Sequence, residues 1–145
     1  MAAASRQERN IELIRAGFAA FDAGQADAVL EVLDQDVEVH TAPGLLNAGT
    51  YRGRDGYLAW LTGWLEAWED FEAEAARLEP VGKRHVLVTV RQAARGTGSG
   101  VAVEMRNHWA FEIGDGRVTR IHLYPEREQA LAAIEGWRRG EEVSR

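Results

Sequence analysis

The polar residues that the sequence places on the apolar faces of its predicted strands are neutral. Thr41 ends one alternating segment, Gln92 ends another, and Asn107 lies between Met105 and Trp109 in a third. Hydroxyl and amide groups exchange hydrogen bonds, but acid–base catalysis needs an ionisable group whose pKa is tuned by its surroundings. These residues favour hydrogen bonding to a carbonyl or hydroxyl group over proton transfer, and the sequence identifies no catalytic residue.

Asn107 is the most informative of these residues because its neighbours on the same face are Met105, Trp109 and Phe111. An amide buried there without a partner costs about 1–3 kcal/mol. Two kinds of partner would satisfy this amide. One is internal, a group on a helix or a bound water, and the other is a bound ligand. Of the two, we favour the ligand.

Aromatic side chains are concentrated on one predicted helix. Trp60, Trp64 and Trp68 recur at four-residue steps, which places them on one stripe. Such side chains line pockets for flat ligands, but they also simply fill cores, and both interpretations stay open. Trp68 fits the core or an edge better than a pocket. The predicted ligand-binding residues are Asn107, Trp109, Trp60, Trp64, Met105, Gln92, Thr41, Leu123 and Tyr51.

Histidines gather on the opposite face of the predicted sheet. His40, His108 and His122 share that face with Glu38 and Glu104. Histidine and carboxylate groups suit zinc, but the spacing matches no sequential metal motif. We therefore expect histidines at the surface or at a dimer interface, and no bound metal.

Helices are predicted to position these residues in the first half of the chain. Apolar residues recur at helical spacing from Ile11 to Phe21, and Gly24 is placed to end that helix. A short helix is predicted at about 27–33. The tryptophan stripe belongs to a helix that begins near Asp55, a plausible N-cap, and runs to about Ala76.

Strands follow wherever the apolar period changes to two. The predicted strands cover 37–41, 86–92, 103–111 and 118–124, and the glycine-rich segment 42–53 is a candidate lid with a short strand around Tyr51. A short helix is expected over 128–137. Turns at 95–100 and 114–116 predict the cross-strand pairs Trp109 with Ile121, Asn107 with Leu123 and Val88, His108 with His122, and Arg91 with Glu104. Helices followed by antiparallel strands indicate an α+β fold.

Composition excludes several classes of partner. The 145 residues suit one domain, 46% of them are apolar, and the formal net charge is −6. Nucleic acid and anionic lipid need a basic face, so neither is expected as a partner. No cysteine is present for disulfides or thiolate chemistry, and no apolar run is long enough to cross a membrane. We expect a cytoplasmic protein without a cofactor.

Several local motifs resemble one family. They are Phe21-Asp22-Ala23-Gly24, Asp36-Val37-Glu38-Val39-His40, Tyr51-Arg52-Gly53-Arg54-Asp55-Gly56, Gly116-Arg117-Val118 and the segment Tyr124 to Leu131. The chain is similar to the nuclear transport factor two-like superfamily, in its SnoaL-like, polyketide cyclase-like branch. The resemblance implies a cone-shaped curved antiparallel sheet on three N-terminal helices, a pocket inside it, and a homodimer through the sheet's outer face. It also predicts a flexible N-terminus at 1–9, a single domain at 10–136 and a charged tail at 137–145.

The catalytic residues of two enzymes in this superfamily are absent from the corresponding positions of this chain. Where ketosteroid isomerase has its aspartate base and its oxyanion-hole tyrosine, this chain has Thr41 and Gly17, and the oxyanion-hole acid falls near Trp109. The aspartate pair of limonene epoxide hydrolase corresponds to Gln92 and Leu123. The sequence therefore predicts binding of a small hydrophobic, partly oxygenated molecule. An isomerase, cyclase or hydratase and a protein–protein interaction module are the alternatives.

Overall fold

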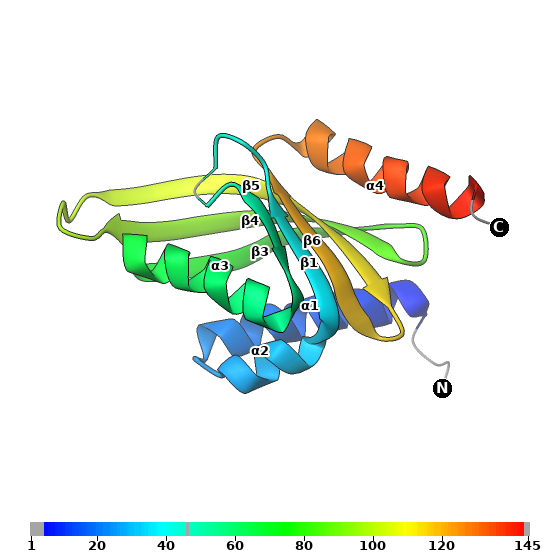
Figure 1. The fold of residues 1–145 in the computed structure, drawn as a ribbon, viewed down its shortest axis with the longest axis horizontal. Helices are drawn as coiled ribbons and strands as arrows, with labels where there is room; N and C mark the ends of the chain where they lie inside the picture. Colours follow the sequence, from blue (N-terminus) through cyan, green and yellow to red (C-terminus); the bar gives the residue numbers. More distant parts are fainter. Residues whose placement is uncertain (1–4, 46, 144–145) are drawn as a thin grey trace.

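The computed structural model describes residues 5–45 and 47–143 and contains four helices and six strands in those ranges (Figure 1). Their bounds are α1 Arg6–Asp22, α2 Ala26–Val32, β1 Leu33–Thr41, β2 Gly49–Arg52, α3 Gly53–Ala67, β3 Trp68–Val81, β4 His85–Gly96, β5 Ala102–Gly114, β6 Arg117–Tyr124 and α4 Arg127–Val143. The predicted α+β class is confirmed. No helix among the described residues is long and apolar enough to span a membrane.

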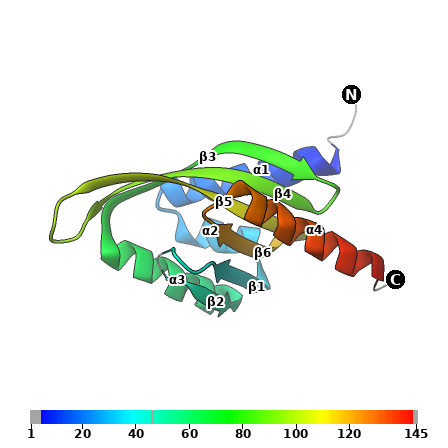
Figure 2. The ribbon, with the colours of Figure 1, turned by 90° about the horizontal axis from the view of Figure 1, so that it is seen from above.

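One six-stranded sheet organises the molecule, with the strand order β2-β1-β6-β5-β4-β3. All neighbouring strands are antiparallel except β1 and β6, which run parallel. Helix α3 contacts both β1 and β3, although three strands, β6, β5 and β4, lie between them in the sheet order. The sheet is therefore strongly curved. It does not close into a barrel, since β2 and β3 remain edges. Figure 1 shows α1 and α2 below the sheet and α4 above it, and Figure 2, seen from above, shows α4 crossing in front of the sheet.

Helix α1 forms where the sequence predicts it. The Ser5 hydroxyl accepts a hydrogen bond from the Glu8 backbone N–H, which caps the first turn. Ile14 is buried, and Gly24 adopts φ 71° beyond the end of the helix, a conformation that glycine tolerates. The helix already begins at Arg6, inside the segment that the sequence predicts to be flexible.

The third helix is shorter than predicted. It ends at Ala67, and residues 68–81, expected to be helical as far as Ala76, form strand β3 instead. Glutamate and alanine favour helices locally, but this segment also alternates, with Phe71 and Ala73 inward and glutamates outward. Pairing with β4 satisfies one side of the β3 backbone over most of its length, so tertiary pairing overrides local propensity.

The predicted cross-strand register is also wrong, by two residues at both hairpins. Trp109 lies opposite Leu123 and Val88, Asn107 opposite Val90, and His108 opposite Tyr124 and Thr89. The first turn is tighter than expected, because Gly96 N–H bonds the Val101 carbonyl, and the second has a bulge at Glu112 and Ile113. A shift of two residues preserves which face each side chain occupies, so the predicted faces hold. Arg91 lies opposite Arg106 but still pairs diagonally with Glu104, at 2.9 Å from Nε to Oε1.

Helix α4 covers part of the sheet's outer face. The predicted short helix is present but runs to Val143, past the expected domain limit at 136. Ala130 and Ile134 are fully buried against Leu87 and Ala110. The predicted homodimer through the outer face stays a prediction, and α4 occupies part of the surface that it would use.

Candidate functional site

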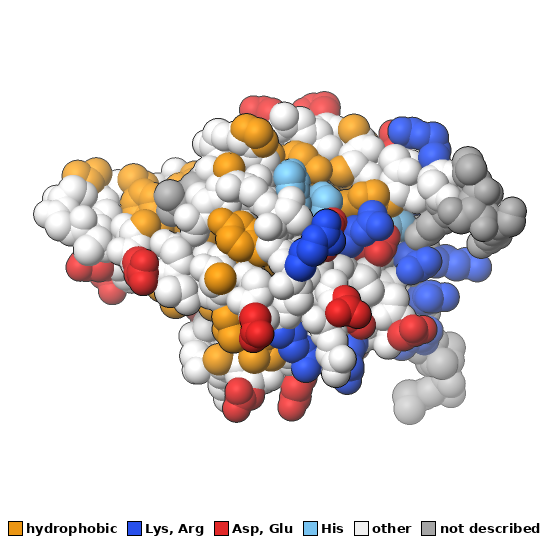
Figure 3. Space-filling model, viewed as in Figure 1, with side chains coloured by type: hydrophobic (Ala, Val, Ile, Leu, Met, Phe, Trp, Pro, Cys, Tyr) orange, Lys and Arg blue, Asp and Glu red, His pale blue; other side chains and the backbone are white. Residues whose placement is uncertain are grey.

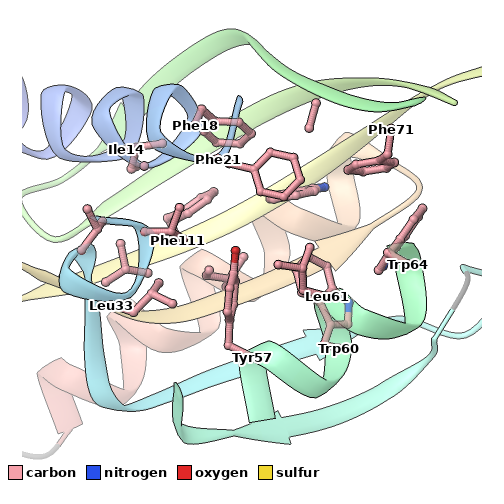
Figure 4. A pocket seen from close by; sticks show the side chains of 17 residues that line it. Ile14, Phe18, Phe21, Leu33, Tyr57, Trp60, Leu61, Trp64, Phe71 and Phe111 are labelled. Carbon is pink, nitrogen blue, oxygen red and sulfur yellow. The ribbon is translucent and has the colours of Figure 1, made fainter. Parts of the chain in front are cut away.

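An apolar cavity lies between α1, α3 and the concave face of the sheet (Figure 4). Its volume is about 70 Å³, counted as the space open to the centre of a water molecule, and it is only partly enclosed. Aromatic and aliphatic side chains dominate the wall. They include Ile14, Phe18 and Phe21 from α1, Tyr57, Trp60, Leu61 and Trp64 from α3, and Phe71, Ala73, Trp109, Phe111, Val118 and Ile121 from the strands.

This volume sets the size of a possible occupant. One water needs roughly 10–15 Å³ by this measure, and an engineered apolar cavity of roughly 150 Å³ holds benzene. At about 70 Å³, the cavity has room for a few atoms without any movement. Anything as large as a six-membered ring must use the open side or displace one of the aromatic side chains.

Tyr57 is the polar group that faces the cavity. Its hydroxyl points into the space between α1 and α3 (Figure 4), and it has no hydrogen-bond partner among the described residues. The residue is only 7% exposed, and burial raises the pKa of Tyr57 to about 12. The hydroxyl therefore stays protonated near neutral pH and acts as a hydrogen-bond donor. The site residues predicted from the sequence do not include Tyr57, although it lies on the same helical stripe as Trp60 and Trp64.

Three predicted ligand contacts, Trp60, Trp64 and Trp109, do line the cavity. Their rings are in contact, with centroids 6.4 Å apart for Trp60 and Trp64 and 6.1 Å for Trp60 and Trp109. Trp60 Nε1 donates to the Thr41 hydroxyl at 3.1 Å. The indole N–H groups of Trp64 and Trp109 are buried without an acceptor among the described residues. Thr41 is therefore engaged with an indole, behind the cavity wall.

Two further predicted contacts, Asn107 and Gln92, are paired with each other. Asn107 Nδ2 donates to Gln92 Oε1, both residues are buried, and neither lines the cavity. Gln92 Nε2 has no acceptor in the described part of the chain. Met105 lies opposite Gln92 on the neighbouring strand and is half-buried.

The last two predicted residues lie outside the cavity wall. Leu123 is fully buried opposite Trp109, and Tyr51 on β2 donates its hydroxyl to the Asn47 carbonyl at 3.1 Å. A ligand contact by these two residues, or by Thr41, Asn107, Gln92 and Met105, stays a prediction.

Ionisable groups lie on the outer side of the sheet. His122 Nε2 and Glu38 Oε2 are 2.7 Å apart, and Arg52 pairs with the same carboxylate. Burial raises the pKa of Glu38, but the hydrogen bond and charge of His122, together with the charges of Arg52 and Arg120, outweigh burial, so the pKa is lowered overall. Burial lowers the pKa of His122, with Glu38 opposing that shift. Figure 3 shows histidines beside basic and acidic side chains on the face between α3 and α4.

A second outer cluster surrounds Glu112. Its carboxylate lies 3.3 Å from His85 Nε2 and accepts a hydrogen bond from the Thr119 hydroxyl at 2.7 Å. Burial raises its pKa, but these hydrogen bonds and Arg120 outweigh burial, so the pKa of Glu112 falls to about 2. No group of three potential metal-ligating side chains occurs in the described ranges. Neither cluster contributes a side chain to the cavity wall.

Comparisons with known proteins agree with this architecture. The model of the SnoaL-like domain family matches residues 14–121. No curated protein matches the chain. Among solved structures, TerC co-crystallised with polyporic acid is 21% identical, covers 88% of this chain and 98% of its own, and has a TM-score of 0.73. A putative polyketide cyclase from Xanthomonas campestris pv. campestris is 20% identical, with coverages of 88% and 98% and a TM-score of 0.69.

A third structure is somewhat more similar in sequence. The nuclear transport factor two-like protein from Burkholderia xenovorans LB400 is 26% identical, with coverages of 88% and 95% and a TM-score of 0.66. The likenesses at 21% and 20% identity show a common fold, whereas the family match covers most of the chain. The chain therefore belongs to the family of SnoaL-like domains.

Proposed function

We propose that this protein binds a small hydrophobic, partly oxygenated molecule in the cavity between α1, α3 and the sheet. The observation that carries this proposal is an apolar cavity wall interrupted by one unpaired hydroxyl, that of Tyr57. Ligand sites are typically apolar hollows with a small number of placed polar groups. A protein–protein interaction module without a ligand is favoured less, because its core is expected to be filled.

Catalysis of an isomerase, cyclase or hydratase type has less support than binding. No carboxylate or histidine lines the cavity among the described residues, so no acid–base pair is available there. Tyr57, with a pKa of about 12, is a donor and not a base at neutral pH. A reaction in this cavity would therefore depend on the substrate's own reactivity, with Tyr57 stabilising negative charge on an oxygen.

Filling the cavity tests the proposal. Gly17 lines the cavity from α1, and a Cβ added there meets only Val32, at an ordinary contact distance of 3.7 Å. Gly17→Leu is therefore expected to fold and to occupy the space that a ligand needs. Ala16→Leu is the matched control, because Ala16 is the neighbouring residue of the same helix and is exposed.

Native mass spectrometry of the three proteins, purified from their own host, measures the retained small molecule. We expect the wild-type protein and Ala16→Leu to retain it and Gly17→Leu to lose it, with matching circular dichroism spectra. Retention by a folded Gly17→Leu variant would place the ligand elsewhere and refute the proposal.

A further inference from the structure

The polar side-chain atoms around the cavity are hydrogen-bond donors. The wall contains the indole N–H groups of Trp60, Trp64 and Trp109 and the hydroxyl of Tyr57, and its other side chains are apolar. An indole nitrogen only donates, whereas a phenol both donates and accepts. The Trp60 N–H is satisfied by Thr41, while those of Trp64 and Trp109 lack an acceptor in the described residues. The unused hydrogen-bonding capacity around the cavity is thus mainly that of donors.

Within this set, the Tyr57 hydroxyl is the donor that reaches the open space. The N–H atoms of Trp64 and Trp109 are sealed from a water-sized probe by neighbouring side chains. The Tyr57 hydroxyl points into the cavity from α3, beneath Phe18 and Phe21 of α1 (Figure 4). The wall around this hydroxyl is apolar, so a hydrogen bond that it donates to an incoming acceptor is stronger here than at the exposed surface.

We propose that Tyr57 anchors the ligand by donating a hydrogen bond to an oxygen that carries no proton, as in a ketone or quinone carbonyl. This inference rests on the proposed function and specifies the ligand's chemical class.

Other ligand groups fit this wall less well. An ammonium or hydroxyl group brings donors, and the wall offers only the Tyr57 oxygen to accept them. A carboxylate that enters the cavity loses its hydration and gains one hydrogen bond in exchange, with no basic side chain in the wall to pair with its charge. This exchange is unfavourable in an apolar site. A neutral carbonyl needs one donor and has no proton to place, so its requirements match those of the cavity.

Two probes of similar shape isolate the effect of the oxygen. Cyclohexanone and methylenecyclohexane differ by a carbonyl oxygen in place of a CH₂ group, and the binding of each is measured by ligand-observed NMR. Tyr57→Phe removes the hydroxyl and keeps the ring. Tyr124→Phe is the matched control, because its hydroxyl lies at the outer face near His122.

The measured quantity is the ratio of the dissociation constants of the ketone and the alkene. We expect Tyr57→Phe to raise this ratio about 3- to 10-fold, the effect of losing one net hydrogen bond, and Tyr124→Phe to leave it unchanged. If both probes bind and the ratio of their dissociation constants is the same in all three proteins, the anchoring role is overturned while the proposed function stays intact. Binding of neither probe to the wild-type protein would contradict both.

A second measurement needs no variant. The carbonyl stretch of ¹³C-labelled cyclohexanone is recorded by difference infrared spectroscopy in the wild-type complex. We expect a frequency below that of the same ketone in hydrocarbon, because a donated hydrogen bond weakens the C=O bond. A hydrocarbon-like frequency for the bound ketone would contradict the inference even if Tyr57→Phe does not fold.

Discussion

The buried pair formed by Asn107 and Gln92 allows its role to be tested by substitution. Asn107→Leu removes the donor to Gln92 Oε1 and leaves both ends of the glutamine amide unpaired, since Gln92 Nε2 already lacks an acceptor among the described residues. We expect a loss of about 2–3 kcal/mol in the free energy of unfolding. Gln92→Leu leaves the Asn107 amide without its partner but also removes an unpaired N–H group. The expected loss in the free energy of unfolding is therefore smaller, about 1 kcal/mol.

The double variant provides the decisive comparison. Replacing both partners by leucine removes every polar group of the pair, which is expected to leave stability within about 1 kcal/mol of the wild type. The single losses add to about 3–4 kcal/mol, so a double variant as stable as the wild type shows a coupling of that size. Urea denaturation with equal m values measures these differences, and a loss of 2 kcal/mol lowers the melting temperature by about 4–8 °C.

Additive losses, or an unchanged stability of Asn107→Leu, would refute this account of the pair. Affinity for cyclohexanone, measured on the same variants, tests the ligand contact that the sequence predicts for Asn107. An affinity loss without a stability loss would assign Asn107 to the ligand and not to Gln92.

Two further changes test the outer cluster and the 42–53 loop. The folded pKa of Glu112 is about 2, below the ordinary 4.5, so its ionised form stabilises the fold above pH 4.5 and this contribution is lost as the pH falls toward 2. Denaturation of the wild type and of Glu112→Gln is expected to show a stability difference that shrinks over that interval, and a difference independent of pH would contradict it. Gly63→Ala is expected to lower the melting temperature, because the added methyl group would overlap the Asn47 amide that donates to the Trp60 carbonyl. Asn47→Gly removes the Asn47 side chain, and glycine suits the φ of 59° at that position. In this background Gly63→Ala is expected to stabilise the protein by up to about 1 kcal/mol, because alanine favours the helix more than glycine does. A loss of stability in both backgrounds would exclude the clash as the cause.

Face assignments were predictable from the sequence because they depend only on the period of two. Register was not, because it depends on turn geometry. The turn after Gly96 closes through one hydrogen bond to Val101, and the bulge at Glu112 shifts the second hairpin, yet neither has a distinctive local signature. The predicted partners moved by two residues, while Trp109 and Asn107 stayed on the inner face.

Strand β3 was missed because its local and tertiary preferences conflict. The run from Glu72 to Ala76 is rich in helix-forming residues, and the alternation of Phe71 and Ala73 with glutamates was the available signal for a strand. The predicted site lacks Tyr57 for a different reason. Its helical spacing with Trp60 indicated a shared face, but only the packed structure shows that its hydroxyl lacks a partner and faces open space.

The smallest residues of the wall account for the presence of the cavity. Gly17 on α1 and Ala73 on β3 line a space that is otherwise surrounded by larger aromatic and aliphatic side chains. Glycine in a helix interior costs roughly 0.5–1 kcal/mol relative to alanine. Nothing local requires it at this position, because a Cβ would meet only Val32 at 3.7 Å and no left-handed φ is involved. What Gly17 provides is room beside Phe18 and Tyr57, at a cost in helix stability that binding a molecule in that room would offset.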